Sequence, residues 1–236
     1  MKPYTLSIAL MLLLSCGSYY GIAQGSVYYA KGIYNLYKIT DTLKTDHASV
    51  TLQVLWMDSI IEVRQTISLR YNLESERKWR HDSTYLPAAS DTTRYFELRK
   101  NAAQNCHSYS LEKFFQYHKF SNQLFYGRTV LTENHYMDDI LATAFKRINA
   151  RSTRPRKNLK EPFTKGSLII FRNKWGTPIH SVFYDGEFQT KNGVFKAKAE
   201  KSIQSIFKTY WDTTTIEEYG LDIAKVNRYE NRQLLN

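Results

Sequence analysis

Two short apolar runs joined to a tight turn constrain the fold of this chain most. Residues 168–171 form an uninterrupted apolar run, and residues 180–184 contain a second one, headed by His180 and Ser181. Asp185 and Gly186 separate the second run from residues 187–191, and an Asp-Gly pair between alternating segments favours a β-hairpin. The sequence therefore predicts strands in this part of the chain, with a two-residue turn at Asp185 and Gly186.

A two-residue period earlier in the chain predicts further strands. Apolar and polar side chains alternate over residues 50–54 and again over residues 61–73. We expect these two strands to turn at Asp58 and Ser59. A helical period fits the first segment but fails in the second. Tyrosines and β-branched residues over residues 27–39 predict another strand.

Apolar residues recur at helical spacing in the second half of the chain. One such segment, residues 111–118, follows Cys106 and places that cysteine at a helix N-terminus. A second helix is expected over residues 136–148, ending before a basic loop. Three further elements are expected near the C-terminus: a helix over residues 199–211, a strand over 213–221 and a short helical segment over 222–228.

The first residues are typical of a secretory signal. They have a positively charged start and an apolar run over residues 6–14, which is too short to span a bilayer comfortably. Two processing routes remain open. Residues 13–17 resemble the lipobox of bacterial lipoproteins, in which Cys16 is lipidated, whereas small residues further on allow ordinary cleavage before Gln24. We expect residues 1–24 to be a signal peptide outside the fold.

Export would leave Cys106 without a cysteine partner. The chain has 2 cysteines, and both processing routes either lipidate or remove Cys16. A lone thiol in an oxidising compartment is a liability unless it is buried or used. Cys106 is therefore either an inert buried residue or a functional thiol. The predicted location is the bacterial cell envelope, as a periplasmic protein or a membrane-anchored lipoprotein.

Positive charge is concentrated in one stretch. The formal net charge is +11, and residues 146–165 carry a dense share of it. Such a stretch attracts polyanions, and export favours lipid phosphates or acidic wall polymers over nucleic acid. A solvated basic loop without a ligand remains the alternative.

Cys106 and His180 carry the functional prediction. A free thiol is mostly protonated at neutral pH, whereas the positive end of a helix and a nearby imidazolium both favour the reactive thiolate. His180 opens an apolar strand, from which it can point into a cleft on a rigid support. His107 is adjacent to Cys106 on the same predicted helix, so it projects in a different direction and is a poor base. The alternative for His180 is a hydrogen-bonded structural histidine.

Three segments resemble the NlpC-type and amidase-type cysteine peptidases of the papain-like superfamily. They are Asn-Cys-His-Ser-Tyr from residue 105, Lys-Gly-Ser-Leu-Ile-Ile-Phe from residue 165, and Pro-Ile-His-Ser-Val-Phe-Tyr-Asp-Gly from residue 178. The resemblance covers roughly residues 95–195. It implies an α+β fold with a papain-like core, in which the helix that carries the cysteine packs on an antiparallel sheet. The hydrolase domain would span residues 94–236, after a β-rich region over residues 26–80.

The resemblance also implies catalytic roles. Cys106 would be the nucleophile and His180 the base. The family's third residue, which orients the base, is His, Asn or Gln. Of these types, Gln189 shares the face of His180 across a two-residue turn, together with Lys191, whereas Asn192 does so only with a bulge. Both remain candidates. The family often supplies a Tyr upstream of the cysteine as an oxyanion donor, and Tyr95 lies at about the right separation, although a core aromatic is the alternative.

Three positions depart from the family pattern, and they motivate a second hypothesis. Asn105 replaces the usual Asp, His107 replaces a small polar residue, and Ser167 replaces the Asp that follows the glycine. The first hypothesis is an exported cysteine hydrolase that cleaves an amide bond, in cell-wall peptide or another peptide substrate. The second is a catalytically inactive papain-like envelope protein that binds polyanionic surface material.

Metal and cofactor sites are not predicted. The 6 histidines include no HExxH motif and no pair at ligand spacing, and 2 cysteines are too few for a zinc site. Glycine-rich phosphate loops are absent from the sequence as well. We therefore expect neither a metal nor a nucleotide cofactor.

Overall fold

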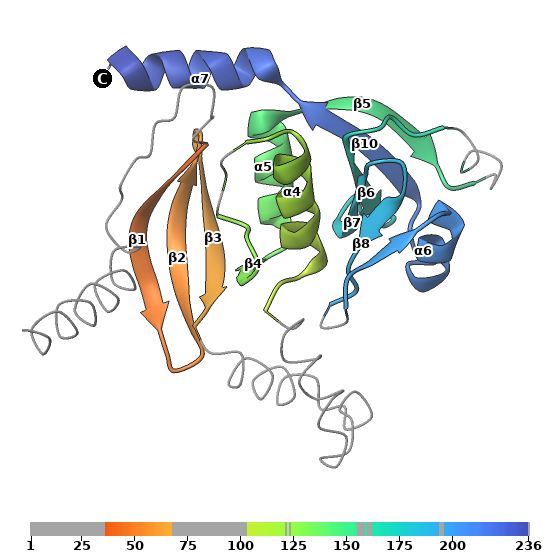
Figure 1. Cartoon of the computed structure of the whole chain (residues 1–236), viewed down its shortest axis with the longest axis horizontal. Coiled ribbons are helices and arrows are strands. Elements are labelled where there is room, and N and C mark those ends of the chain that lie inside the picture. The colour runs from red at the N-terminus through yellow and green to blue at the C-terminus, as the bar shows by residue number, and fades with distance from the viewer. Residues whose placement is uncertain are drawn as a thin grey trace, which may run out of the picture.

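The computed structural model describes residues 36–67, 103–120, 122, 124–154, 159, 162–193 and 196–235. This part of the chain is an α+β structure with two antiparallel sheets, which confirms the coarse fold class (Figure 1). The predicted signal peptide and Tyr95 lie outside the described residues.

The first sheet has the strand order β1-β2-β3-β4. Its strands are β1 (Tyr37–Thr45), β2 (Ser49–Trp56), β3 (Ser59–Thr66) and β4 (Thr129–Leu131). A turn joins β2 to β3 as predicted, but it lies at Met57 and Asp58, one residue earlier than expected, because Ser59 already pairs with Trp56. Met57 adopts a φ of 50°. Left-handed backbone of this kind suits the two-residue turn of a hairpin. The predicted alternation is confirmed as well, because Leu52, Val54 and Trp56 are all buried.

The second sheet has the order β5-β10-β6-β7-β8-β9, and each neighbouring pair is antiparallel. Its strands are β5 (Phe145–Ser152), β6 (Ser167–Arg172), β7 (Pro178–Tyr184), β8 (Phe188–Thr190), β9 (Lys198–Glu200) and β10 (Thr215–Leu221). The predicted strands over residues 168–171, 180–184 and 213–221 are therefore confirmed. Strand β6 is buried along nearly its whole length, as its continuous apolar run requires.

Four helices accompany the sheets in the described residues: α4 (Cys106–Tyr117), α5 (His135–Ala144), α6 (Ile203–Thr209) and α7 (Ile223–Leu235). Figure 1 shows α4 and α5 between the two sheets. Helix α4 packs on β7, and β4, which follows α4 in the chain, pairs with β3 of the first sheet. The two sheets therefore share one interior.

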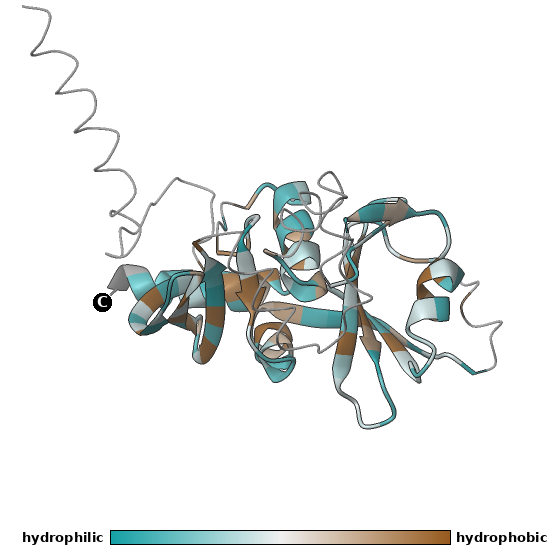
Figure 2. Ribbon diagram, turned by 90° about the horizontal axis from the view of Figure 1, so that it is seen from below, coloured by the Kyte–Doolittle hydropathy of each residue, from teal (hydrophilic) through white to brown (hydrophobic). Residues whose placement is uncertain are grey.

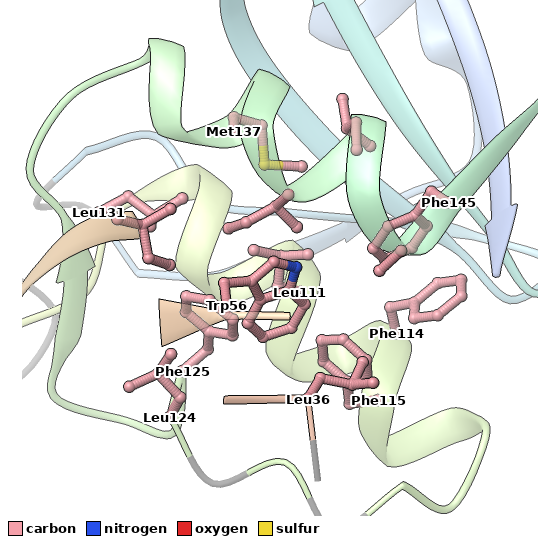
Figure 3. Close-up of a cluster of buried hydrophobic side chains, with 14 of the residues drawn as sticks. Leu36, Trp56, Leu111, Phe114, Phe115, Leu124, Phe125, Leu131, Met137 and Phe145 are labelled. Carbon is pink, nitrogen blue, oxygen red and sulfur yellow. The ribbon is translucent and has the colours of Figure 1, made fainter. Parts of the chain in front are cut away.

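Aromatic rings fill that interior. Trp56 of β2 lies 5.6 Å from Phe125 and 6.0 Å from Phe115 of α4 between ring centroids, and Phe114 lies 5.0 Å from Phe145 at the start of β5 (Figure 3). Figure 2 shows hydrophobic stretches on the strands in the interior and hydrophilic residues in most of the connecting turns. Burial of several large rings fixes α4 between the sheets.

The predicted helix over residues 136–148 is wrong at its C-terminal end. Helix α5 ends at Ala144, and Phe145 is already extended, with φ of −117° and ψ of 158°. The apolar stripe continues past this point, but β10 pairs with β5 from Phe145 to Ser152. The first part of the predicted basic loop is therefore a strand. Similarly, the predicted helix over 199–211 is shorter, because β9 and the N-cap Ser202 precede α6.

Candidate active site

The N-terminus of α4 lies where the sequence predicts it. Asn105 is the N-cap, and its side-chain oxygen accepts a hydrogen bond of 2.9 Å from the Ser108 N–H. Its side-chain nitrogen donates to the Leu131 carbonyl oxygen at 3.2 Å. Cys106 is the first helical residue, where unpaired N–H groups give a partial positive charge.

The sulfur of Cys106 lies against β7. Although the residue as a whole is partly exposed, burial raises the pKa of its thiol to about 11. The backbone N–H groups of Ser181 and His107, and then the positive charge of Lys191, partly offset this effect. The thiol is therefore protonated at neutral pH, in surroundings that carry groups able to stabilise a negative charge.

Three polar side chains connect α4 to β7. The Ser181 hydroxyl oxygen lies 2.6 Å from that of Ser110 and 3.0 Å from Nδ1 of His107. Burial lowers the pKa of His107 to about 4, against an opposing effect from the Asn134 side chain and with a smaller contribution from the charge of Arg172. His107 is thus a neutral member of this contact, with its Nδ1 turned toward Ser181.

His180 occupies a closed aromatic environment. Its ring stacks on Tyr210 at 3.9 Å between centroids with an interplanar angle of 14°, and Phe171 packs against it at 5.5 Å. Nε2 lies 2.8 Å from the Thr190 hydroxyl, whereas Nδ1 is buried and has no hydrogen-bond partner among the described residues. Burial lowers the pKa of His180 well below its ordinary value, and the nearby His107 adds to the effect. The ring is therefore neutral at physiological pH.

The side chains of His107 and His180 lie in different surroundings, on the two sides of β7. Side chains alternate sides along a strand, so Ser181 faces α4 while His180 faces Tyr210. The structure brings the thiol of Cys106 to the backbone of Ser181, the residue that follows His180. It does not join the thiol to the His180 ring by a hydrogen bond.

The hairpin after β7 differs from its prediction by one residue. Phe183 pairs with Gln189 and Tyr184 with Phe188, so the connection has three residues, and the predicted two-residue turn is wrong. The Asp185 side chain stabilises the longer connection by accepting from the Glu187 N–H at 3.1 Å. The pairing places Gln189 on the face of Phe183, opposite to His180.

The two candidate third residues form hydrogen bonds with other side chains. Gln189 donates to the Asp185 carboxylate at 3.2 Å, and Asn192 accepts from the Tyr210 hydroxyl at 3.3 Å. Thr190 lies within hydrogen-bond distance of the His180 ring, and sequence reasoning missed it. The hairpin register was the missing information, because it decides which residue of β8 shares the His180 face.

Lys191 was also missed as a member of the site. Its side chain is 3% exposed, and its ammonium group donates to the Gly193 carbonyl oxygen. A buried lysine is uncommon. Its neighbourhood in the sequence carries no motif, so only the packing of β8 against α4 could reveal its proximity to Cys106.

Two arginines of the predicted polyanion-binding stretch form ion pairs with β10, one of them buried and the other exposed. Arg151 forms a 3.0 Å ion pair with Glu218, and both side chains are almost fully buried. Arg147 forms a 2.8 Å ion pair with Glu217. These pairs connect β5 to β10, so both residues have a structural partner in the fold.

A groove of about 620 Å³ lies between the β2–β3 turn, α5 and α7. Lys225, Arg228 and Arg232 line it, together with Asp58, which pairs with Arg232 at 2.8 Å. None of its lining residues belongs to the predicted catalytic set. Within the described residues, no group of three or more His, Cys, Asp or Glu side chains could hold a metal ion.

Comparison with family models, with curated proteins and with solved structures found no match for this chain. Among the helices of the described residues, none is both long and apolar enough to cross a bilayer.

Proposed function

We propose that the chain is an exported cysteine hydrolase of papain-like architecture, which cleaves an amide bond in cell-wall peptide or a similar substrate. The observation that carries this proposal is the state of His180. Its Nε2 lies within hydrogen-bond distance of the Thr190 hydroxyl, while its buried Nδ1 has no hydrogen-bond partner in the part of the chain that the structure describes. An unpaired buried polar atom costs about 1–3 kcal/mol, and such exceptions call for an explanation such as catalysis.

The environment of Cys106 supports the role of nucleophile. The thiol lies at a helix N-terminus, on the backbone of the residue next to His180. The Ser181 and His107 N–H groups that lie near the sulfur are the kind of donors that stabilise an oxyanion. Lys191 adds a positive charge nearby. Negative charge that develops at this point during a reaction therefore meets favourable partners.

The proposed reaction proceeds through an acyl-enzyme. The Cys106 sulfur forms a bond to the carbonyl carbon while its proton passes to Nδ1 of His180, and the oxyanion accepts hydrogen bonds from backbone N–H groups. The C–N bond then breaks, and His180 returns the proton to the leaving amine. Water hydrolyses the thioester in a second, equivalent sequence. Because no hydrogen bond joins thiol and ring in the free protein, substrate binding must bring them together, as catalytic contacts often tighten in the substrate complex.

A second candidate is the inactive papain-like envelope protein that binds polyanionic surface material. Two observations favour it: burial raises the pKa of Cys106 to about 11, and the His180 ring faces Tyr210. A thiol held in its protonated form, without a base in contact, is a weak nucleophile.

Acylation of Cys106 by p-nitrophenyl acetate distinguishes the two candidates. The reference protein carries Cys16→Ser, so that Cys106 is the sole thiol, and mass spectrometry follows the acetyl adduct. A hydrolase acylates faster when folded than in urea. His180→Ala should slow acylation of the folded protein about 100-fold or more, the usual contribution of a general base.

His135→Ala is the matched control, because His135 is exposed on α5. It should acylate at the parent rate. If the folded parent acylates more slowly than the urea-unfolded chain, and His180→Ala changes nothing, the hydrolase proposal is wrong and the inactive candidate stands.

A further inference from the structure

Two tryptophans project into solvent from the second sheet. Trp175 is 76% exposed in the turn between β6 and β7, and Trp211 is 77% exposed in the segment between α6 and β10. They are the most exposed large hydrophobic side chains of the described residues. Tryptophan is usually largely buried, so two indoles at this exposure call for a partner.

Both tryptophans lie at the same end of the sheet. The Thr214 N–H donates to the Arg172 carbonyl oxygen at 2.8 Å, which ties the start of β10 to the end of β6. Tyr210, next to Trp211, packs its ring on His180 near the start of β7. Trp175 lies in the turn that joins these same ends of β6 and β7. The two indoles thus belong to adjacent turns.

Each turn is held in one conformation by hydrogen bonds. The Asn173 side chain accepts from the N–H groups of Trp175 and Thr177, both at 3.0 Å. The Thr213 hydroxyl and N–H both donate to the Tyr210 carbonyl oxygen, at 2.6 and 3.1 Å. The indoles are therefore presented on ordered turns rather than on frayed ends.

Three exposed cations lie on or beside the turns that carry the two indoles. The Lys174 ammonium lies 4.4 Å from the Trp175 ring, and Lys208 is exposed in the last turn of α6, just before Trp211. Arg154 is exposed where β5 ends, next to the Thr153 N–H that donates to the Thr214 carbonyl oxygen at 3.0 Å. Asp212 is an acidic residue of this region, and Asp138 pairs with Arg172 at the end of β6 at 2.7 Å. We call the set Trp175, Trp211, Lys174, Lys208 and Arg154 the tryptophan end.

We infer that the tryptophan end is a docking surface for an anionic lipid bilayer. Indole rings favour the headgroup level of a bilayer, where the ring is partly apolar and its N–H stays hydrated. Each basic side chain near the surface gains from the negative potential of anionic lipids. A protein partner fits less well, because lysine is depleted at protein interfaces. The net charge of +11 acts in the same direction.

Vesicle binding by the full chain tests this inference. Sedimentation with vesicles of phosphatidylglycerol and phosphatidylcholine, compared with phosphatidylcholine alone, gives the partition coefficient and its dependence on headgroup charge. Trp175→Ser together with Trp211→Ser should lower partitioning about tenfold or more on the anionic vesicles. Lys174→Gln together with Lys208→Gln should lower it about tenfold at low salt, and less at high salt.

Ile60→Ser together with Ile67→Ser is the matched control, since both isoleucines are exposed, at 57% and 54%, on the first sheet. It should partition like the parent. Brominated lipids should quench the fluorescence of the parent but much less that of the double tryptophan variant. Equal partitioning of parent and tryptophan variant, equal binding to both vesicle types, or absence of vesicle binding would each overturn the inference. Because neither Cys106 nor His180 is altered, acylation of Cys106 is expected to stay at the parent rate, so this test stands apart from that of the proposed hydrolase.

Discussion

Replacing Arg151 with methionine should destabilise the protein strongly. The Arg151 guanidinium pairs with Glu218 at 3.0 Å, and the exposed fractions of the two side chains are 4% and 2%. It also lies 4.0 Å from the centre of the Phe163 ring. In Arg151→Met the carboxylate stays buried and keeps the hydrogen bond that the Thr164 N–H donates at 2.7 Å. Removal of one partner from a buried ion pair costs about 3–5 kcal/mol.

A second substitution should remove most of that loss. In Arg151→Met with Glu218→Gln the buried group is neutral, and the glutamine oxygen can still accept from the Thr164 N–H. Replacement of both charges is often close to neutral, so we expect the double variant within about 1–2 kcal/mol of the parent. Arg147→Met is the control on the same strand: its ion pair with Glu217 is 2.8 Å long, but its side chain is 58% exposed. An exposed pair is worth about 0–1 kcal/mol.

Urea unfolding followed by far-ultraviolet circular dichroism measures all three variants. With an m-value of about 2–3 kcal/mol/M, the single Arg151 variant should shift the midpoint down by about 1–2 M. The reasoning is refuted if Arg151→Met and Arg147→Met lose the same free energy, or if the double variant is as unstable as the single one. Equal losses would mean that solvent reaches Glu218, whereas an unimproved double variant would mean that lost packing, and not the unpaired charge, causes the instability.

Two further predictions concern α4 and the turn before β6. Asn105→Ala removes the acceptor of the Ser108 N–H and should lower the free energy of unfolding by about 1 kcal/mol, measured by urea unfolding. Unchanged stability would contradict the capping role of Asn105. Gly166→Ala should lower the free energy of unfolding by about 1–3 kcal/mol in the same assay, because φ is +85° and the new Cβ would lie 3.0 Å from the Tyr117 ring. Gly186→Ala is the control. It is also at positive φ, but no described atom lies within 4 Å of the new Cβ, so it should lower the free energy of unfolding less.

Local patterns predicted the strands well. The alternation over residues 50–54 and 61–73 and the apolar run over 168–171 each mark a strand of the structure as far as it is described. A period of two residues is imposed by the pleat itself, so it survives in any tertiary context. Cys106 at a helix N-terminus was predictable for a similar reason, since Asn105 caps the first turn locally.

Elements that depend on distant partners were less predictable. Residues 145–148 continue the apolar stripe of α5, yet they form a strand because β10 offers hydrogen bonds to them. The ion pairs of Arg147 and Arg151 depend on the same distant strand, β10, so the sequence alone could not show which basic residues have an acidic partner. Tertiary pairing outweighed local propensity at this junction.

The arrangement of the candidate site depended on a single residue of loop length. With a two-residue turn Gln189 would share the face of His180, whereas the three-residue connection gives that face to Thr190. The Asp-Gly pair favours a two-residue turn. The Asp185 carboxylate, however, accepts a hydrogen bond from the Glu187 N–H and so stabilises a connection that is one residue longer. The sequence therefore showed that the hairpin carries polar residues near His180, but it did not show which of them shares the face of His180.

The titration of Cys106 gives a final prediction, which separates resting reactivity from catalysis. Burial raises the thiol pKa from an ordinary 9.0 to about 11, so at pH 7 the folded protein holds about 100-fold less thiolate than the unfolded chain. Iodoacetamide reacts with the thiolate, so in the Cys16→Ser protein its rate should be about 100-fold lower when folded and should rise tenfold per pH unit up to about pH 11. The same shift favours the folded state below pH 9, and this stabilisation is lost as the pH rises toward 11, because the unfolded chain then releases the thiol proton first.

Lys191→Met should raise the pKa of the Cys106 thiol further and slow its alkylation, since the positive charge of Lys191 lowers that pKa in the parent. An alkylation midpoint near pH 7 would show that the thiol is already activated at rest, and the substrate-driven approach of His180 to Cys106 would then be unnecessary.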